Sequence, residues 1–101
     1  MPTLPSGWSK KNDKLLLVLK CDDFTHALAL LNSVADIAEK HQHHPDIAIR
    51  NYNELLVSTT THSANKLTSK DYDLAQDISD LIDYQATKQD IEDNGRNIDL
   101  V

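Results

Sequence analysis

Four of the five histidines of this 101-residue chain fall close together, and their spacing is the strongest chemical signal in the sequence. His41, His43 and His44 lie just before Pro45, and His62 follows seventeen residues after that proline. The imidazole side chain has an unperturbed pKa of about 6.5, so it both donates and accepts protons near neutral pH. It is also a common metal ligand. The cluster therefore predicts either a proton-transfer site or a metal site.

The metal site is the less favoured of these two interpretations. A zinc ion could in principle take its ligands from one carboxylate and three imidazoles: Glu39, His43, His44 and His62. Side chains of adjacent residues point apart on an extended backbone, and the chain has no His-x-x-x-His helical pair. The single cysteine, Cys21, excludes both a pair of cysteine ligands and an intrachain disulfide. We therefore expect proton transfer without a bound metal.

The bulk composition excludes several classes of protein. Hydrophobic residues make up 40% of the chain and charged residues 26%, which is ordinary for a globular protein of one domain. The formal net charge of −6 disfavours direct binding to nucleic acid or to an anionic membrane, because both need a basic face. The chain has no apolar run of about 18 residues, which a membrane span requires, and no signal-peptide pattern at its start. We therefore expect a cytoplasmic protein.

Apolar periodicity predicts four short strands. Residues 8–10 and 14–20 read as two strands joined by a turn, and residues 47–61 read as a hairpin that turns at residues 51–53. Side chains alternate along a strand, so His62 is expected to continue one face of the last strand. The other members of that face are Leu56, Ser58 and Thr60.

Two helices are predicted between and after these strands. The first runs from Phe24 to about His41, is capped by Asp22 or Asp23, and ends before the proline that follows. Its buried face is expected to hold seven apolar side chains at helical spacing: Phe24, Ala27, Leu28, Leu31, Val34, Ala35 and Ala38. The sequence Thr68-Ser69-Lys70-Asp71 has the form of a capping box, which predicts the start of the second helix.

These elements predict an α+β fold in which helices pack on one face of a four-stranded antiparallel sheet, in the order β-β-α-β-β-α. Residues 1–83 are expected to form the domain, and residues 84–101 a polar, acidic tail. The run Leu15–Leu19 carries apolar side chains on both faces, which one layer of helices cannot cover. We therefore expect a homodimer or homotetramer, with the strand Leu55–Thr61 pairing edge to edge with a symmetry mate.

Several motifs together resemble the pterin-4a-carbinolamine dehydratase family, over roughly residues 4–83. They are Glu39-Lys40-x-x-His43-His44-Pro45, Tyr52-Asn53, Thr61-His62, Leu67-Thr68 and Asp71. The resemblance implies a four-stranded antiparallel sheet with helices on one face, assembled into dimers or tetramers. It also implies dehydration of 4a-hydroxytetrahydropterin to quinonoid dihydropterin, which recycles the cofactor of aromatic amino acid hydroxylases. The pterin is the substrate, and no metal or organic cofactor is required.

The resemblance also assigns roles to residues. His43 and His62 would take the acid and base roles, in an order that the sequence leaves open, and His44 would support substrate binding and electrostatics. Loss of water from a carbinolamine needs both roles, and each such proton transfer is typically worth ~10²–10⁴-fold in rate. The remaining residues expected at the pterin are Glu39, Gln42, Pro45, Thr60, Thr61, Ser63 and Asp71. For Asp71, capping of the second helix is an equally good explanation.

His26 and His41 are expected to be surface residues without a catalytic role. The family usually has small residues before Leu-Thr, whereas this chain has Asn65 and Lys66, of which only asparagine readily adopts a left-handed backbone.

The alternative function is a non-catalytic interaction module of the same fold, acting as a transcriptional dimerisation cofactor or an enzyme-assembly factor. Retention of His43, His44 and His62 favours the enzyme.

Overall fold

We analysed a computed structural model, which describes residues 3–83 of the chain. The predicted element order is confirmed, and the predicted tail, residues 84–101, lies outside the described residues. The elements named along the chain are β1 (Trp8–Lys11), β2 (Lys14–Lys20), α1 (Phe24–His41), β3 (Asp46–Arg50), β4 (Glu54–Thr59) and the single turn of 3₁₀ helix η1 (His62–Ala64). A second helix follows over residues 69–83.

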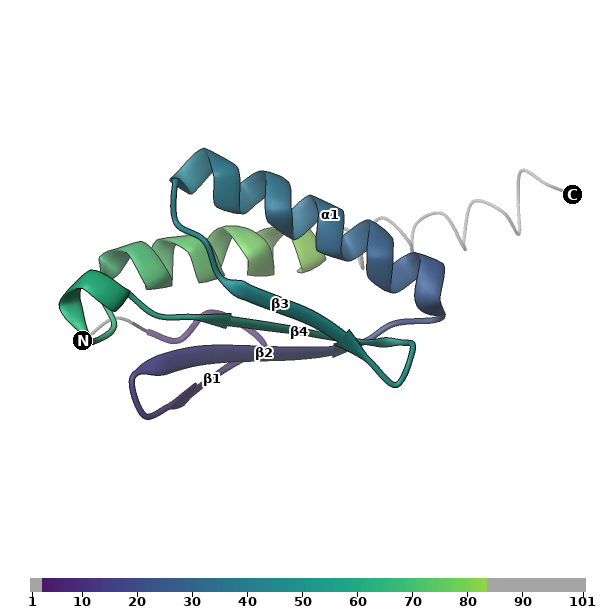
Figure 1. Cartoon of the computed structure of the whole chain (residues 1–101), viewed down its shortest axis with the longest axis horizontal. Helices are drawn as coiled ribbons and strands as arrows, with labels where there is room; N and C mark the ends of the chain where they lie inside the picture. The colour runs from purple at the N-terminus through teal and green to yellow at the C-terminus, as the bar shows by residue number, and fades with distance from the viewer. Residues whose placement is uncertain (1–2, 84–101) are drawn as a thin grey trace, which may run out of the picture.

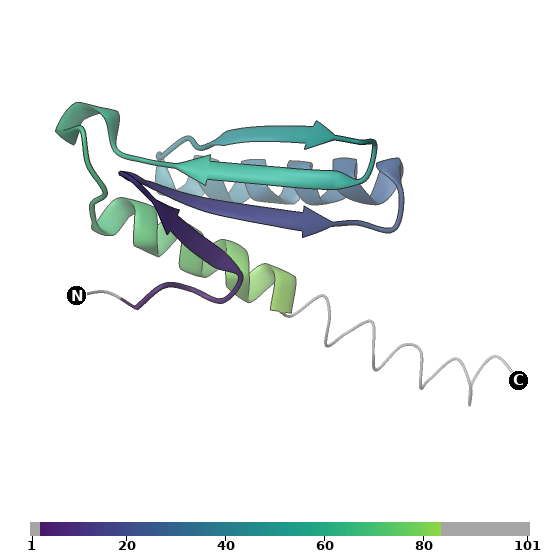
Figure 2. The same ribbon diagram turned by 90° about the horizontal axis from the view of Figure 1, so that it is seen from below.

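The four strands form one antiparallel sheet in the order β1-β2-β4-β3, and both helices cover the same face of it (Figure 1). Figure 2 shows the opposite face of the sheet, in front of the helices. The expectation that the strand Leu55–Thr61 lies at a sheet edge is wrong. Val57 pairs with Leu17 on one side and with Ile47 on the other, so β4 is an inner strand and the edges are β1 and β3.

The strands alternate between a buried and an open face, as their side-chain period of two requires. On the face covered by the helices, β2 and β4 contribute four fully buried residues: Leu15, Leu17, Leu55 and Val57. On the open face Leu16 and Leu56 are half-buried, and Val18 is 44% exposed. The predicted presence of apolar side chains on both faces of β2 is therefore confirmed.

Helix α1 begins at its predicted cap. The Asp23 carboxylate accepts a hydrogen bond of 2.8 Å from the backbone N–H of His26, which satisfies one of the free donors of the first turn. The buried face differs from the predicted one, because Phe24 is 51% and Leu28 40% exposed while Leu30 is buried. The helix carries two overlapping apolar stripes at helical spacing, and only packing on the sheet decides which of them is covered.

The turn between β3 and β4 is held by a buried asparagine. Asn51 and Tyr52 both have positive φ, 50° and 58°, as a tight antiparallel hairpin turn requires. The Asn53 side chain donates 3.1 Å to the carbonyl of Cys21, and the Cys21 N–H donates 2.7 Å to the carbonyl of Asn53. The end of β2 is thereby fixed to the start of β4.

No helix among residues 3–83 is long and apolar enough to cross a membrane.

Candidate active site

The buried carboxylate of Asp71 stands at the centre of the candidate site. Its Oδ1 accepts from the Thr59 hydroxyl at 2.7 Å and lies 2.7 Å from Nε2 of His43. Its Oδ2 accepts from the Thr61 hydroxyl at 2.6 Å and from the backbone N–H of Thr68 at 3.0 Å. The carboxylate has no exposed surface, so each oxygen depends on these partners.

The hydrogen bonds keep this carboxylate ionised. Burial by itself raises the pKa of Asp71, but hydrogen bonds from Thr61, His43 and Thr59 and from the Thr68 N–H oppose burial, and the net result is a lowered pKa. An ionised carboxylate only accepts hydrogen bonds, so the proton between the two residues is assigned to Nε2 of His43. In neutral His43 the other ring nitrogen, Nδ1, then carries the lone pair and is the group left to meet a substrate.

The end of helix α1 places His43 next to the Asp71 carboxylate. Gln42 ends the helix in a left-handed conformation, with φ 52°. The N–H of Gln42 donates to the carbonyl of Glu39, and that of His43 to the carbonyl of Ala38, so the last turn is capped by the chain that leaves it. The chain reverses at this point, and the His43 side chain is placed over the start of the second helix.

The predicted capping box is half formed. The Thr68 N–H donates to Asp71, as one half of the box requires. The Thr68 hydroxyl instead lies 2.8 Å from the hydroxyl of Thr61, and the N–H of Asp71 donates to the Thr68 carbonyl. Asp71 therefore caps the second helix and also holds His43, and its expected role at the pterin stays a prediction.

His44 points away from His43, as expected for adjacent residues. Its Nε2 lies 2.5 Å from a carboxylate oxygen of Glu39, and these two side chains are 64% and 69% exposed, whereas that of His43 is 12% exposed. The Gln42 amide donates 2.8 Å to the Glu39 carbonyl and holds the same turn. Glu39 and His44 thus form an exposed hydrogen-bonded pair, in contrast to the buried carboxylate that holds His43.

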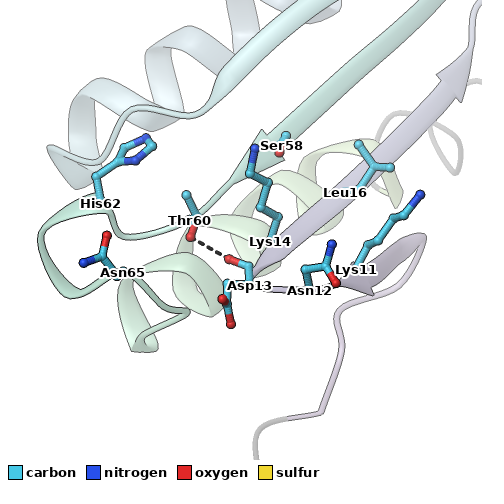
Figure 3. A pocket seen from close by; sticks show the side chains of 9 residues that line it. All are labelled: Lys11, Asn12, Asp13, Lys14, Leu16, Ser58, Thr60, His62 and Asn65. Carbon is cyan, nitrogen blue, oxygen red and sulfur yellow. Dashed lines mark hydrogen bonds between the residues drawn. The ribbon is translucent and has the colours of Figure 1, made fainter.

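His62 borders a cavity of about 580 Å³ on the open face of the sheet (Figure 3). The prediction that His62 continues the face of Ser58 and Thr60 is confirmed, because all three line this cavity although β4 ends at Thr59. The complete lining is Lys11, Asn12, Asp13, Lys14, Leu16, Ser58, Thr60, His62 and Asn65. Neither His43 nor His44 lines it, so the three histidines do not share one cavity.

One buried side chain connects the Asp71 carboxylate to the segment that borders the cavity. Thr61 donates to Asp71, which holds His43, while the next residue, His62, faces the cavity. Asn65 ends η1 with φ 55°, and Lys66 is not among the residues with positive φ, as expected from their backbone preferences. The alternation of the chain from Thr59 to His62 therefore determines which polar groups face the helices and which face the cavity.

Several expected site residues lie outside these hydrogen-bonded groups. Ser63 is exposed on η1, and Pro45 is half-buried after the two histidines. His41 lies 2.5 Å from Asp77 of the second helix, and the ring of His26 accepts the N–H of Asp22 at 3.1 Å, so both have structural partners. Of the four side chains weighed as zinc ligands, Glu39 pairs with His44, His43 pairs with Asp71, and His62 borders the cavity. Within residues 3–83 no three His, Cys, Asp or Glu side chains are grouped so as to hold a metal ion.

Thr59 and most of the cavity lining were not predicted from the sequence. Thr59 is 1% exposed and sits two residues before Thr61 on a face that is otherwise apolar. Two hydroxyls at buried positions of one strand need a common buried acceptor, and this was the available signal. Lys11 and Lys14 gave no comparable signal, because only the pairing of β2 with β4 brings them to the same cavity as His62.

Comparison with known proteins identifies the family of this chain. A family model described as pterin 4 alpha carbinolamine dehydratase matches residues 1–81. Two curated relatives share the name "Putative pterin-4-alpha-carbinolamine dehydratase". That of Trichormus variabilis is 45% identical over 76 residues, which is 75% of this chain and 81% of the relative. That of a Cyanothece species is 46% identical over 74 residues, 73% of this chain and 75% of the relative.

A solved structure is similar as well. The crystal structure of a transcriptional coactivator/pterin dehydratase from Brucella melitensis matches with a TM-score of 0.66 and 32% sequence identity. The match covers 73% of this chain and 80% of that one. Sequence and fold thus agree, and the chain belongs to the pterin 4 alpha carbinolamine dehydratase family.

Proposed function

We propose that this protein is a hydro-lyase that dehydrates 4a-hydroxytetrahydropterin to quinonoid dihydropterin by histidine acid–base catalysis. The observation that supports this most is the His43–Asp71 pair, in which a buried, ionised carboxylate lies 2.7 Å from Nε2 of a part-exposed imidazole. Such a carboxylate fixes the ring orientation and stabilises the imidazolium that forms when the ring takes a proton. Family membership supplies the substrate class.

The reaction needs one proton donor and one acceptor. A proton is delivered to the 4a-hydroxyl oxygen, the C4a–O bond breaks with its electron pair on oxygen, and water leaves. A ring nitrogen loses its proton, and the electrons of that N–H bond form the new C=N double bond. The enzyme thus gives one proton and takes one, so its net protonation is unchanged.

His43 and His62 are proposed for these two steps. His43 presents Nδ1, since Nε2 is held by Asp71, and His62 borders the cavity with Thr60 beside it. Each histidine can serve as acid or base, depending on its protonation when the pterin arrives. His44, held by Glu39, lies beside His43 in the chain and is proposed to bind polar groups of the pterin.

The reaction is proposed to proceed without metal or organic cofactor, in pterin recycling in the cytoplasm, by a homo-oligomer. Stopped-flow absorbance of 4a-hydroxytetrahydropterin decay tests the activity. We expect decay faster than the uncatalysed control, and the same rate after EDTA treatment. Decay at the uncatalysed rate would contradict the dehydratase, and loss of the rate in EDTA would point to a metal enzyme.

A second candidate function is an interaction module for a transcription factor. The name of the Brucella melitensis structure joins both descriptions for that protein. In this chain the open face of the sheet carries Val18, 44% exposed, beside half-buried Leu16 and Leu56, a surface that a partner chain could cover. A transcription assay with His43→Ala would separate the two, because an interaction module keeps its effect when turnover is lost.

A further inference from the structure

We propose that the cavity beside His62 binds an anionic group, and that the substrate is therefore a pterin whose side chain carries a phosphate or carboxylate. This inference rests on the proposed function and adds the substrate class. It assigns Lys11 and Lys14 as residues that determine specificity. The dehydration chemistry uses neither residue.

The cavity is built by two segments far apart in sequence. The turn between β1 and β2 supplies one wall, and the end of β4 with η1 supplies the other. The Thr60 hydroxyl donates 2.5 Å to the carbonyl of Asp13 and joins the two walls. The volume of the cavity, about 580 Å³, falls in the range of ~300–1,000 Å³ that is usual for small-molecule sites.

The charge of this cavity is opposite to that of the protein. Lys11 and Lys14 contribute two positive charges to the lining and Asp13 one negative charge, a formal sum of +1, whereas the whole chain carries −6. Neither lysine forms an ion pair with any residue between 3 and 83. Two ammonium groups without a carboxylate partner, in one concave site, attract an anionic ligand.

The polar groups around the lysines suit an anion. Ser58 can donate a hydroxyl, and Asn12 and Asn65 can donate amide N–H groups to phosphate or carboxylate oxygens. The Thr60 hydroxyl is already used on the Asp13 carbonyl. These hydrogen-bond donors suit an anion better than a cation, because a cation site needs carboxylate and carbonyl oxygens.

The order of residues along the cavity locates the anionic group on the ligand. In Figure 3 His62 lies at one end of the cavity, Lys11 at the other and Lys14 between them. A pterin ring that reacts at His62 would send its side chain past Lys14 toward Leu16 and Lys11. The charge therefore belongs to the far end of the side chain and not to the ring.

The test compares two ligands that differ only in one phosphate: 7,8-dihydroneopterin and its 3′-phosphate. Dissociation constants are measured by calorimetry at low salt for the wild-type chain, for Lys11→Gln/Lys14→Gln, and for Lys20→Gln. Lys20 lies at the other end of β2 from Lys14, is exposed and does not line the cavity, so it is a matched control.

We expect the phosphate ester to bind the wild-type chain about tenfold more tightly, as two exposed charge pairs allow. The preference should persist in Lys20→Gln, disappear in the double variant and weaken as salt is raised. Affinity for neutral dihydroneopterin should be the same in all three proteins. A parallel comparison of dihydrofolate with its glutamate dimethyl ester distinguishes a carboxylate source of the anion from a phosphate source.

Equal affinity of the wild-type chain for the charged and uncharged member of both pairs would overturn this inference, and so would a preference that survives in the double variant. Neither result touches the dehydratase, since the neutral pterin still binds. Failure of all four pterins to bind would instead overturn the proposed function, and this inference with it.

Discussion

Nε2 of His43 lies 2.7 Å from Oδ1 of Asp71, and the two residues, 28 positions apart in the chain, meet where the end of α1 passes over the start of the second helix. The carboxylate also accepts hydrogen bonds from two threonine hydroxyls and one backbone N–H, so four partners hold it in place. We therefore expect Asp71 to act as a positioning residue for His43.

Replacing Asp71 by Asn should lower turnover by about 10²-fold, within the range of acid–base effects, because the amide no longer fixes the Nε2–H form of His43. We expect KM to change little, since the carboxylate is buried away from solvent. Steady-state kinetics of Asp71→Asn measures both constants. Asp77→Asn is the control, because Asp77 pairs with His41 outside the site, and its turnover should stay near wild type. A larger change in KM than in kcat would contradict the positioning role.

Removal of either proposed proton-transfer group should lower turnover strongly. His43→Ala and His62→Ala are each expected to reduce turnover by about one to four orders of magnitude. The double variant should lose less than the product of the two single losses if the imidazoles act as a unit. His41→Ala serves as the reference and should remain near wild type. Similar small losses from all three substitutions would show that the histidines carry no distinct catalytic role.

Asp71 should also make stability depend on pH. Its folded-state pKa is lowered, so the unfolded chain binds the proton more readily, and the resulting stabilisation is fully present above the unfolded pKa of about 3.9. It is lost as the pH falls through the folded pKa. Urea unfolding between pH 7 and pH 3 measures this, with Asp71→Asn as the variant that lacks the ionisable group. The difference in unfolding free energy between the two proteins should be constant above about pH 5 and should shrink below it; a constant difference across the whole range would contradict the prediction.

We expect a homo-oligomer that pairs through β3. This strand is a sheet edge, and β1, the other edge, is protected by the charges of Lys10 and Lys11. A two-fold antiparallel pairing centred on Asp46–Arg50 would place the two copies of Ala48 side by side, so Ala48→Lys should dissociate the assembly by charge repulsion. Ser9→Lys on β1 is the control. Light scattering at micromolar concentration gives the mass, and a wild-type mass of 11.4 kDa would refute the oligomer.

Much of the fold could be predicted because its signals are local. The cap at Asp23, the end of α1 near His41 and the two hairpins depend on neighbouring residues, and all are found where the sequence places them. The buried face of α1 could not be fixed in this way. Phe24 and Leu28 match the helical period as well as Leu30 does, and contact with the sheet alone selects among them.

The residue types and their order along the chain show which groups are present: histidines at a helix end, a Thr-His pair after a strand, and an acidic residue at the start of the second helix. How these groups are paired depends on the folded structure. It placed β4 inside the sheet, brought Asp71 within hydrogen-bonding distance of His43, Thr59 and Thr61, and grouped Lys11, Lys14 and His62 around one cavity. The physical reason is that burial and hydrogen bonding depend on contacts between segments far apart in the chain, which local sequence patterns do not specify.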